Sequence, residues 1–294
     1  MELRIALAQL APRLGDVDAN LELSAEWLRR ATDEGAELIV FPELALTGYL
    51  LQDLVPEVAL RADDPRLAEL SRQAPGVMAA IGFVEETDAH RYCNSVALLR
   101  EGELLGLHRK LYLPTYGLFD EGRFTRAGDR IRTVAVGEPL GRIGLSVCED
   151  FWHPSVPMLQ ALDGASLLVN VAAGPARAPG SAAGIQAIAG WHKMQDTYAL
   201  LGTVAIAFCN RVGNEEGLTF WGGSRLLAAD GSLIAEAPLY EEALVAGTLS
   251  LDDLRMQRYG LPLLADERLE LVRREVDRII AERAGLPPPP EEPA

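Results

Sequence analysis

Short apolar runs rich in Val, Ile and Leu recur along the whole chain and predict β-strands. They span residues 3–10, 36–41, 77–84, 95–99, 143–147, 166–171 and 204–208. Between several of these runs, apolar residues recur every three or four positions, as Leu21, Ala25 and Leu28 do after possible helix caps at Asp16 or Asp18. Strands and helices mixed in this way indicate an α/β fold.

Two turn signals and one further helical pattern refine this picture. Glu101-Gly102 and Asp230-Gly231 each lie between alternating apolar segments, as the turns of β-hairpins do, so part of the sheet is expected to be antiparallel. After residue 266 the apolar residues have helical spacing, which predicts an amphipathic helix over about 266–284 with one buried stripe. The members of this stripe are Leu269, Val272, Val276 and Ile279.

The domain organisation is inferred from the uniform composition of the sequence. No linker, repeat or shift in composition divides it, which predicts a single domain over residues 1–285 with a core over about 1–250. Residues 286–294 are rich in Pro and Glu and are expected to be a disordered tail.

Composition narrows the class of partner. Of the 294 residues, 49% are hydrophobic and 24% charged, as in ordinary soluble proteins, so there is enough apolar material for a core. The 43 acidic and 27 basic residues give a net charge of −16, which disfavours binding to nucleic acid and to anionic membranes. No apolar run approaches the roughly 18 residues of a membrane helix, and the first residues do not resemble a leader, so a cytoplasmic location is expected.

Cysteine and histidine usage argues against a metal or a disulfide framework. Cys93, Cys148 and Cys209 are an odd number without a CxxC pair, and the four histidines form no HExxH or HxH pattern. Glycine-rich phosphate-binding motifs are also absent from the sequence, so no cofactor is expected.

Three polar residues follow apolar runs, at the ends of predicted strands. Glu43 follows the run at residues 38–40, Lys110 ends the segment 103–110, and Cys148 closes the run 144–147. The carboxyl ends of strands are where α/β sheets hold their sites. Each residue also has an ordinary interpretation, since strand-end acids and lysines are commonly solvated and cysteines commonly buried in the core. We expect the core location for Cys93 and Cys209.

Three segments resemble, in order and spacing, the Glu, Lys and Cys blocks of the nitrilase superfamily. They are residues 41–49 (FPELALTGY), 109–121 (RKLYLPTYGLFDE) and 148–152 (CEDFW). The likeness is greatest to the glutamine-hydrolysing domain of glutamine-dependent NAD+ synthetase and extends from about residue 3 to about residue 250. It implies a four-layer α-β-β-α sandwich, and it implies a homodimer or higher homo-oligomer.

The resemblance assigns catalytic roles residue by residue. Cys148 would attack an amide carbonyl and form a thioester, and Glu43 would move protons as general base and acid. Lys110 and the backbone N–H of Glu149 would stabilise the oxyanion. Glu121 matches a second glutamate that supports the lysine and the substrate amide. We also expect alkylation to reach Cys148 before Cys93 or Cys209, because a thiolate beside Lys110 is more populated and more accessible than a core thiol.

Further positions match or adjoin the substrate pocket of these relatives. They are Tyr116, Phe119, Glu149 and Trp152, with Arg177 a candidate for binding a carboxylate. One departure concerns the corner Ala172-Ala173-Gly174, which has no hydroxyl where the glutamine-hydrolysing relatives usually have a serine. This predicts that free glutamine is a poor substrate.

The sequence therefore predicts a carbon–nitrogen hydrolase of the amidase type that acts on a small-molecule amide. Two alternatives stay open: a detached glutaminase that supplies ammonia to a separate NAD+ synthetase, and a non-catalytic scaffold on the same fold. The scaffold is disfavoured because Glu43, Lys110 and Cys148 are all present. The ATP-binding synthetase domain of those relatives has no counterpart in the 294 residues.

Overall fold

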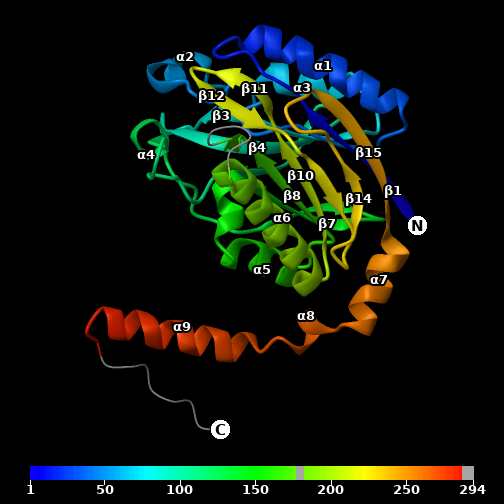
Figure 1. The fold of residues 1–294 in the computed structure, drawn as a ribbon, viewed down its shortest axis with the longest axis vertical. Helices are drawn as coiled ribbons and strands as arrows, with labels where there is room; N and C mark the ends of the chain where they lie inside the picture. Colours follow the sequence, from blue (N-terminus) through cyan, green and yellow to red (C-terminus); the bar gives the residue numbers. More distant parts are fainter. Residues whose placement is uncertain (177–181, 287–294) are drawn as a thin grey trace.

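Two six-stranded sheets lie face to face, and helices cover their outer faces (Figure 1). This arrangement is seen in a computed structural model, which describes residues 1–176 and 182–286. It is the predicted four-layer α-β-β-α sandwich. The prediction for the tail after residue 286 lies outside the described residues.

The first sheet has the strand order β15-β1-β2-β3-β4-β5. β1 and β2 are parallel, as are β2 and β3, whereas β3, β4 and β5 form an antiparallel meander. The predicted turn at Glu101-Gly102 joins β4 to β5. The strands are β1 (Glu2–Gln9), β2 (Leu38–Val40), β3 (Met78–Glu86), β4 (Tyr92–Arg100), β5 (Glu103–Arg109) and β15 (Ala243–Ser250).

The second sheet has the order β14-β13-β10-β8-β7-β6, with β7, β8 and β10 parallel at its centre. Asp230-Gly231 forms the turn between β13 and β14, as predicted. A small third sheet has the order β11-β12-β9. The strands are β6 (Thr133–Gly137), β7 (Gly141–Val147), β8 (Leu167–Ala172), β9 (Pro175–Ala176), β10 (Ala205–Asn210), β11 (Val212–Glu215), β12 (Leu218–Trp221), β13 (Arg225–Leu227) and β14 (Leu233–Glu236).

The outer layers are helical, with α1 and α3 beside the first sheet and α5 and α6 beside the second (Figure 1). Asp16 caps α1, where its carboxylate accepts a hydrogen bond from Ala19 N at 3.1 Å, one of the two predicted caps. The helices are α1 (Val17–Asp33), α2 (Val55–Val58), α3 (Pro65–Arg72), α4 (Glu121–Phe124), α5 (Ser155–Leu162), α6 (Ala182–Gly202), α7 (Leu251–Gly260), α8 (Leu263–Asp266) and α9 (Leu269–Arg283), with 3-10 turns η1 (Gln52–Leu54) and η2 (Cys148–Trp152).

Alternate side chains of β1 face opposite sides of the first sheet, so this strand contributes to two layers of the core. Ile5 and Leu7 point into the core between the sheets, whereas Ala6 and Ala8 point toward the outer helices. Successive side chains of a strand face opposite sides, so large residues fill the inter-sheet space and small ones let the helices approach. All seven predicted strand runs coincide with strands of the two sheets.

The C-terminal helix differs from its prediction in one respect. α9 forms where the sequence predicts it, but no residue in it is buried. Leu269 is 51% exposed and Val276 47%, because α9 extends away from the body of the molecule and packs its apolar face on no described part of the chain (Figure 1). The expected buried stripe is therefore wrong for the single chain.

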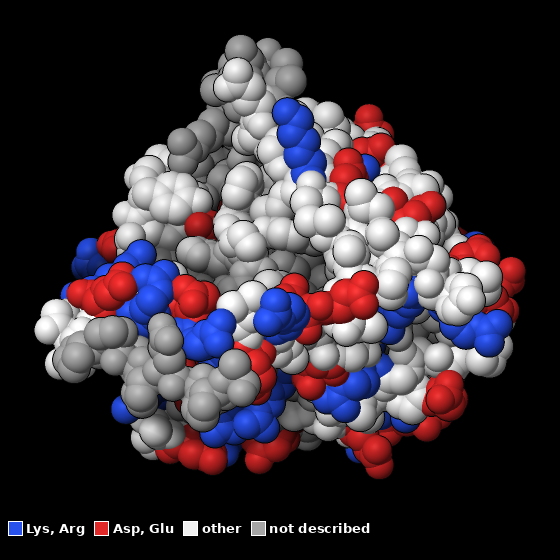
Figure 2. Space-filling view, turned by 90° about the horizontal axis from the view of Figure 1, so that it is seen from below, with Lys and Arg blue, Asp and Glu red and all other residues white. Residues whose placement is uncertain are grey.

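Charges on the face seen from below are mixed rather than gathered by sign. Figure 2 shows acidic and basic side chains intermingled over much of this face. α9 carries ion pairs between residues three or four apart, including Arg278 with Glu275 at 2.8 Å and with Glu282 at 2.7 Å. Such pairs stabilise an exposed helix modestly.

Candidate active site

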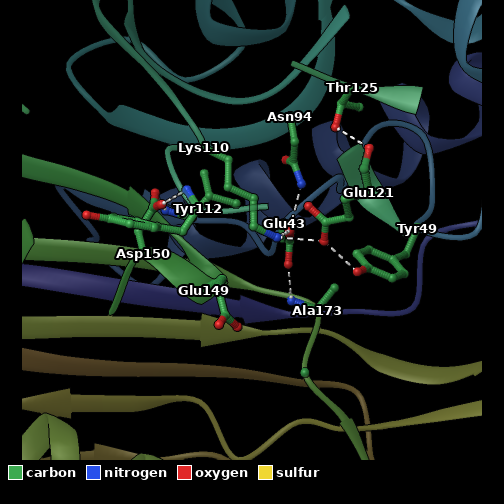
Figure 3. Close-up of polar contacts among 12 residues, drawn as sticks. Glu43, Tyr49, Asn94, Lys110, Tyr112, Glu121, Thr125, Glu149, Asp150 and Ala173 are labelled. Carbon is green, nitrogen blue, oxygen red and sulfur yellow. Dashed lines mark hydrogen bonds and ion pairs between the residues drawn. The ribbon is translucent and has the colours of Figure 1, made fainter. Parts of the chain in front are cut away.

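Four strand ends from the two sheets bring polar groups together. β2 and β5 of the first sheet lead into Glu43 and Lys110, and β7 and β8 of the second lead into Cys148 and Ala173. Figure 3 shows Glu43, Lys110, Glu121 and Ala173 converging at this edge. Residues separated by up to 130 positions therefore meet at one place.

Glu43 is fully buried and accepts three hydrogen bonds. Its Oε1 accepts from Lys110 Nζ at 2.8 Å and from Asn94 Nδ2 at 2.7 Å, and its Oε2 accepts from Ala173 N at 2.7 Å. The carboxyl group is therefore surrounded by three donors. Gly82 makes room for this segment, since a Cβ there would lie 2.5 Å from Leu44 N.

Lys110 is the cation of the site, and its side chain is fully buried. Its Nζ donates to Glu43 at 2.8 Å and to Glu121 at 2.7 Å. Burial alone would lower the pKa of Lys110, but the charges of Glu121 and Glu43 outweigh it and raise the pKa well above its ordinary value. Lys110 is therefore an ammonium with two of its three hydrogens engaged.

Glu121 joins the site through α4, and the same oxygen that meets Lys110 accepts from the Tyr49 hydroxyl at 2.6 Å. Burial raises the pKa of Glu121, while Lys110 opposes this shift. The pKa of Tyr49 is also raised, by burial and then by the charge of Glu121, so the phenol stays a donor. Glu121 Oε2 is buried and has no partner in the described part of the chain.

Cys148 begins the 3-10 turn η2 directly after β7 and has a left-handed backbone with φ of 43°. That conformation is uncommon outside glycine, and such strain is concentrated at functional sites. Burial raises the pKa of Cys148 well above its ordinary value, Glu43 raises it further, and Lys110 lowers it only in part. These shifts do not support a more populated thiolate at Cys148, and the thiol form dominates until a base removes the proton.

Cys93 and Cys209 are both buried in the core, as predicted, whereas Cys148 is partly exposed. Burial raises the pKa of both core thiols. Neither is in contact with Glu43 or Lys110, so Cys148 is the cysteine that the site can use.

Aromatic residues line one side of the site. The Tyr116 hydroxyl donates to Glu149 Oε2 at 2.9 Å, and the Phe119 ring packs edge-on against Tyr116 and Tyr49. Burial raises the pKa of Glu149, and the Tyr116 hydroxyl acts against that shift. The Glu149 carboxylate lies apart from Glu43 and Glu121 (Figure 3).

Trp152, the last residue of η2, is 42% exposed and packs edge-on against Trp191 of α6, with ring centroids 5.2 Å apart. Arg177 lies outside the described residues, so its proposed contact with a substrate carboxylate stays a prediction.

Several groups at the site escape notice in the sequence. Asn94 lies within β4, and Tyr49 lies in the quoted segment 41–49, yet neither has a spacing that marks it. The contribution of Ala173 is a backbone N–H, which no residue type reveals. Asp150 is visible in the sequence only as a neighbour of Cys148.

The described residues form no group of three or more His, Cys, Asp or Glu side chains suited to a metal ion. Within the same residues, no helix is long and apolar enough to cross a bilayer. The site thus comprises a thiol, a carboxylate next to it and a buried ammonium, which together suit nucleophilic attack on an acyl carbon.

Comparisons with known proteins identify the family of the chain. The carbon-nitrogen hydrolase family matches residues 4–259. Glutamine-dependent NAD(+) synthetase of Thermotoga maritima is 36% identical over 260 residues, which are 85% of this chain and 42% of that protein. The chain thus spans less than half the length of this relative.

The chain also matches two solved structures over nearly the whole length of each. The amidase of Nesterenkonia sp. AN1 superposes with a TM-score of 0.75 at 26% identity, over 92% of this chain and 98% of the other. A carbon-nitrogen hydrolase of Helicobacter pylori G27 superposes with a TM-score of 0.84 at 23% identity, over 95% of this chain and 99% of the other, a likeness of fold.

Proposed function

The chain belongs to the carbon–nitrogen hydrolase family, and from that premise we propose that it hydrolyses a small-molecule amide with Cys148 as nucleophile. The observation that carries the proposal is the fully buried Lys110 ammonium. It donates to Glu43 and Glu121, and its charge acts on Cys148. Burying three charged side chains is costly unless they are paired, so a role in the reaction accounts for their presence better than stability does.

Acylation begins with the neutral thiol. Glu43 takes the proton of Cys148 as the sulfur attacks the carbonyl carbon, which places negative charge on the carbonyl oxygen. The third hydrogen of Lys110 Nζ and the N–H of Glu149 stabilise that oxyanion. Glu43 then gives its proton to the nitrogen, the C–N bond breaks, and a thioester with Cys148 is left.

Deacylation uses the same groups in the same order. A water molecule takes the place of the departed amine, and Glu43 removes a proton from it as the oxygen attacks the thioester. Collapse of the tetrahedral intermediate releases the acid, and the proton on Glu43 returns to the Cys148 sulfur. Glu43, held in place by three donors, thus accepts and then delivers one proton in each half-reaction.

A short linear amide is the substrate class that we propose. The Nesterenkonia amidase has been captured with acrylamide added to its active-site cysteine, which supports an amide of that size for a related site. Glu149, held by the Tyr116 hydroxyl, would favour a substrate that carries an ammonium or a hydrogen-bond donor.

Glutamine hydrolysis is the second candidate. It is favoured by the relatives named glutamine-dependent NAD(+) synthetase, of which this chain matches 42–46% of the length in the first three. In that case the chain would supply ammonia to a synthetase. Against it, the corner at Ala173 and Gly174 has no side-chain hydroxyl, and its N–H groups already bind Glu43 and Asn210. A non-catalytic scaffold is disfavoured by the intact set of catalytic groups.

Ammonia release from a panel of monoamides, ω-amides and glutamine tests these candidates, with Cys148→Ala as the blank. We expect turnover of at least one short amide and a thioester adduct on Cys148 by intact mass. A kcat/KM for glutamine above about 10⁴ M⁻¹s⁻¹, the lower end of the range for enzymes, would establish the glutaminase instead. Failure of every amide to react would contradict both.

A further inference from the structure

Asp150 is a fully buried carboxylate that lies two residues after Cys148 and outside the catalytic cluster. Four donors surround it. Its Oδ1 accepts from Leu111 N at 2.9 Å and from Tyr112 N at 3.0 Å. Its Oδ2 accepts from Val147 N at 3.0 Å and lies 2.8 Å from His108 Nε2.

These donors come from both halves of the site. Val147 directly precedes Cys148 at the end of β7 in the second sheet. Leu111 and Tyr112 directly follow Lys110, and His108 lies two residues before it in β5 of the first sheet. Figure 3 shows Asp150 beside Tyr112. The Asp150 side chain, which belongs to the turn η2 that begins at Cys148, thus binds the backbone of the two residues that follow Lys110.

The bonding capacity of Asp150 is fully used. A carboxylate accepts at about four lone-pair positions, and all four are met by protein donors. Because a carboxylate only accepts, His108 Nε2 must carry the hydrogen of that contact. Asp150 is therefore left with no position for substrate or water and acts only through the groups that it binds.

The two groups held in this way need accurate placement. Cys148 has a strained backbone with φ of 43°, and the bond from Val147 N to Asp150 closes the turn in which it lies. The backbone of Lys110 is fixed on its own sheet by bonds from its N–H to Asn94 O and from Gly128 N to its carbonyl, both at 2.8 Å. Together with the Glu43–Ala173 and Tyr116–Glu149 bonds, the Asp150 contacts tie the lysine side of the site to the nucleophile side.

We propose that Asp150, assisted by His108, is a positioning residue that sets the distance between the Cys148 nucleophile and the Lys110 ammonium. The inference rests on the proposed amide hydrolysis. A displacement of about 1 Å at a reacting centre is enough to cost about 10²-fold in rate, so a tie of this kind controls turnover without touching the substrate.

Asp150→Asn is the direct test, because the amide keeps the size of the side chain. Its oxygen can still accept from Leu111 and Tyr112, but its NH₂ group then meets the donor Val147 N. We expect kcat per reactive Cys148 to fall by about 10²-fold, with KM within about threefold of wild type. Reactive sites are counted by iodoacetamide incorporation, which corrects for any unfolded fraction.

A readout that needs no substrate separates this inference from the proposed function. Lys110 lowers the pKa of Cys148, and removal of the negative charge of Asp150 would by itself also lower that pKa, so an upward shift would report a displaced Lys110. Displacement of Lys110 in Asp150→Asn should therefore move the pH profile of Cys148 alkylation upward. An unchanged alkylation profile would overturn the positioning role even if no amide were hydrolysed.

Two further comparisons serve as controls. Asp163→Asn changes a carboxylate that likewise accepts from a backbone N–H, that of Thr133 at 2.9 Å, but its partners Thr133 and Arg142 lie outside the site, so kcat and the alkylation profile should stay at wild-type values. If Asp150→Asn does not fold, two variants of His108 test the positioning role instead. His108→Leu removes one donor and should lower kcat by about tenfold, while His108→Gln, which keeps an N–H near Nε2, should recover most of it.

The results that overturn the inference are distinct from those that overturn the function. If the wild-type protein hydrolyses no amide, only the proposed function is contradicted. Wild type with activity, together with Asp150→Asn within threefold of it per reactive Cys148, contradicts the positioning role. So does a loss in proportion to the loss of reactive sites, since that is what a purely structural residue would give.

Discussion

Replacement of Glu43 by Gln tests the proton transfer at the centre of the mechanism. The amide has nearly the shape of the carboxylate but no basic oxygen, so it neither takes the Cys148 proton nor delivers one to the leaving nitrogen. General acid–base catalysis is commonly worth about 10²–10⁴-fold in rate, and the same residue serves both half-reactions. We expect kcat to fall by at least about 10²-fold.

The structure also predicts a cost in stability. All three groups that contact Glu43 are donors: Lys110 Nζ, Asn94 Nδ2 and Ala173 N. In either orientation the NH₂ group of the substituted side chain faces a donor and leaves at least one of them unsatisfied in a buried site. An unsatisfied buried group costs about 1–3 kcal/mol in the free energy of unfolding, which urea denaturation measures.

Glu85→Gln is the matched control for both the fall in kcat and the loss of stability. Glu85 is 2% exposed and likewise accepts only from donors, Ser95 Oγ at 2.8 Å and Arg109 at 2.6 and 2.7 Å. Its replacement should lower stability by a similar amount and leave kcat within a few-fold. If Glu43→Gln hydrolyses the best amide at a rate within threefold of wild type, Glu43 is structural and the mechanism is refuted.

The other predictions concern Cys148 and Lys110. Cys148→Ala should abolish turnover while its urea midpoint stays near wild type; measurable turnover would exclude a thioester route. Iodoacetamide should label the partly exposed Cys148 before the buried Cys93 and Cys209, at a rate that still rises above pH 9; equal labelling by peptide mass mapping would contradict this. Lys110→Met should lower kcat by about 10²–10³-fold. Burial raises the folded-state pKa of Glu121 and Lys110 opposes that shift, so without the ammonium this variant should lose more stability than wild type as pH rises above the ordinary pKa of a glutamate; a urea midpoint with the wild-type pH dependence would count against the charge network.

The elements that sequence pattern predicts well are those with a strong period or an unbroken apolar run. The parallel strands at the centre of both sheets, such as β8 and β10, are buried on both faces and therefore appear as continuous apolar segments. Short strands with mixed burial, such as β6 and β11, carry no such signal. Their place is set by pairing with neighbouring strands.

The proposed catalytic residues Glu43, Lys110 and Cys148 follow from strand ends combined with family resemblance, but the groups around them do not. Asn94 and Asp150 matter because of which atoms they reach, and that depends on how the two sheets lie against each other. The raised pKa of Cys148 has the same origin, since proximity to Lys110 is expected from the motifs, whereas the effects of burial and of the opposing charge of Glu43 are not.

Division of the site between two sheets also has a consequence for how the enzyme is made. Glu43, Lys110 and Glu121 precede Cys148 and Ala173 in the chain, so a ribosome exposes the charged groups before the nucleophile turn has been synthesised. While the second sheet is absent, these charges keep their hydration, and they lose it only when the sheets dock. Hydrolytic competence should then be among the last properties that a refolding chain acquires, after its helices and strands have formed. Partly synthesised or partly folded chains are accordingly expected to lack the proposed activity.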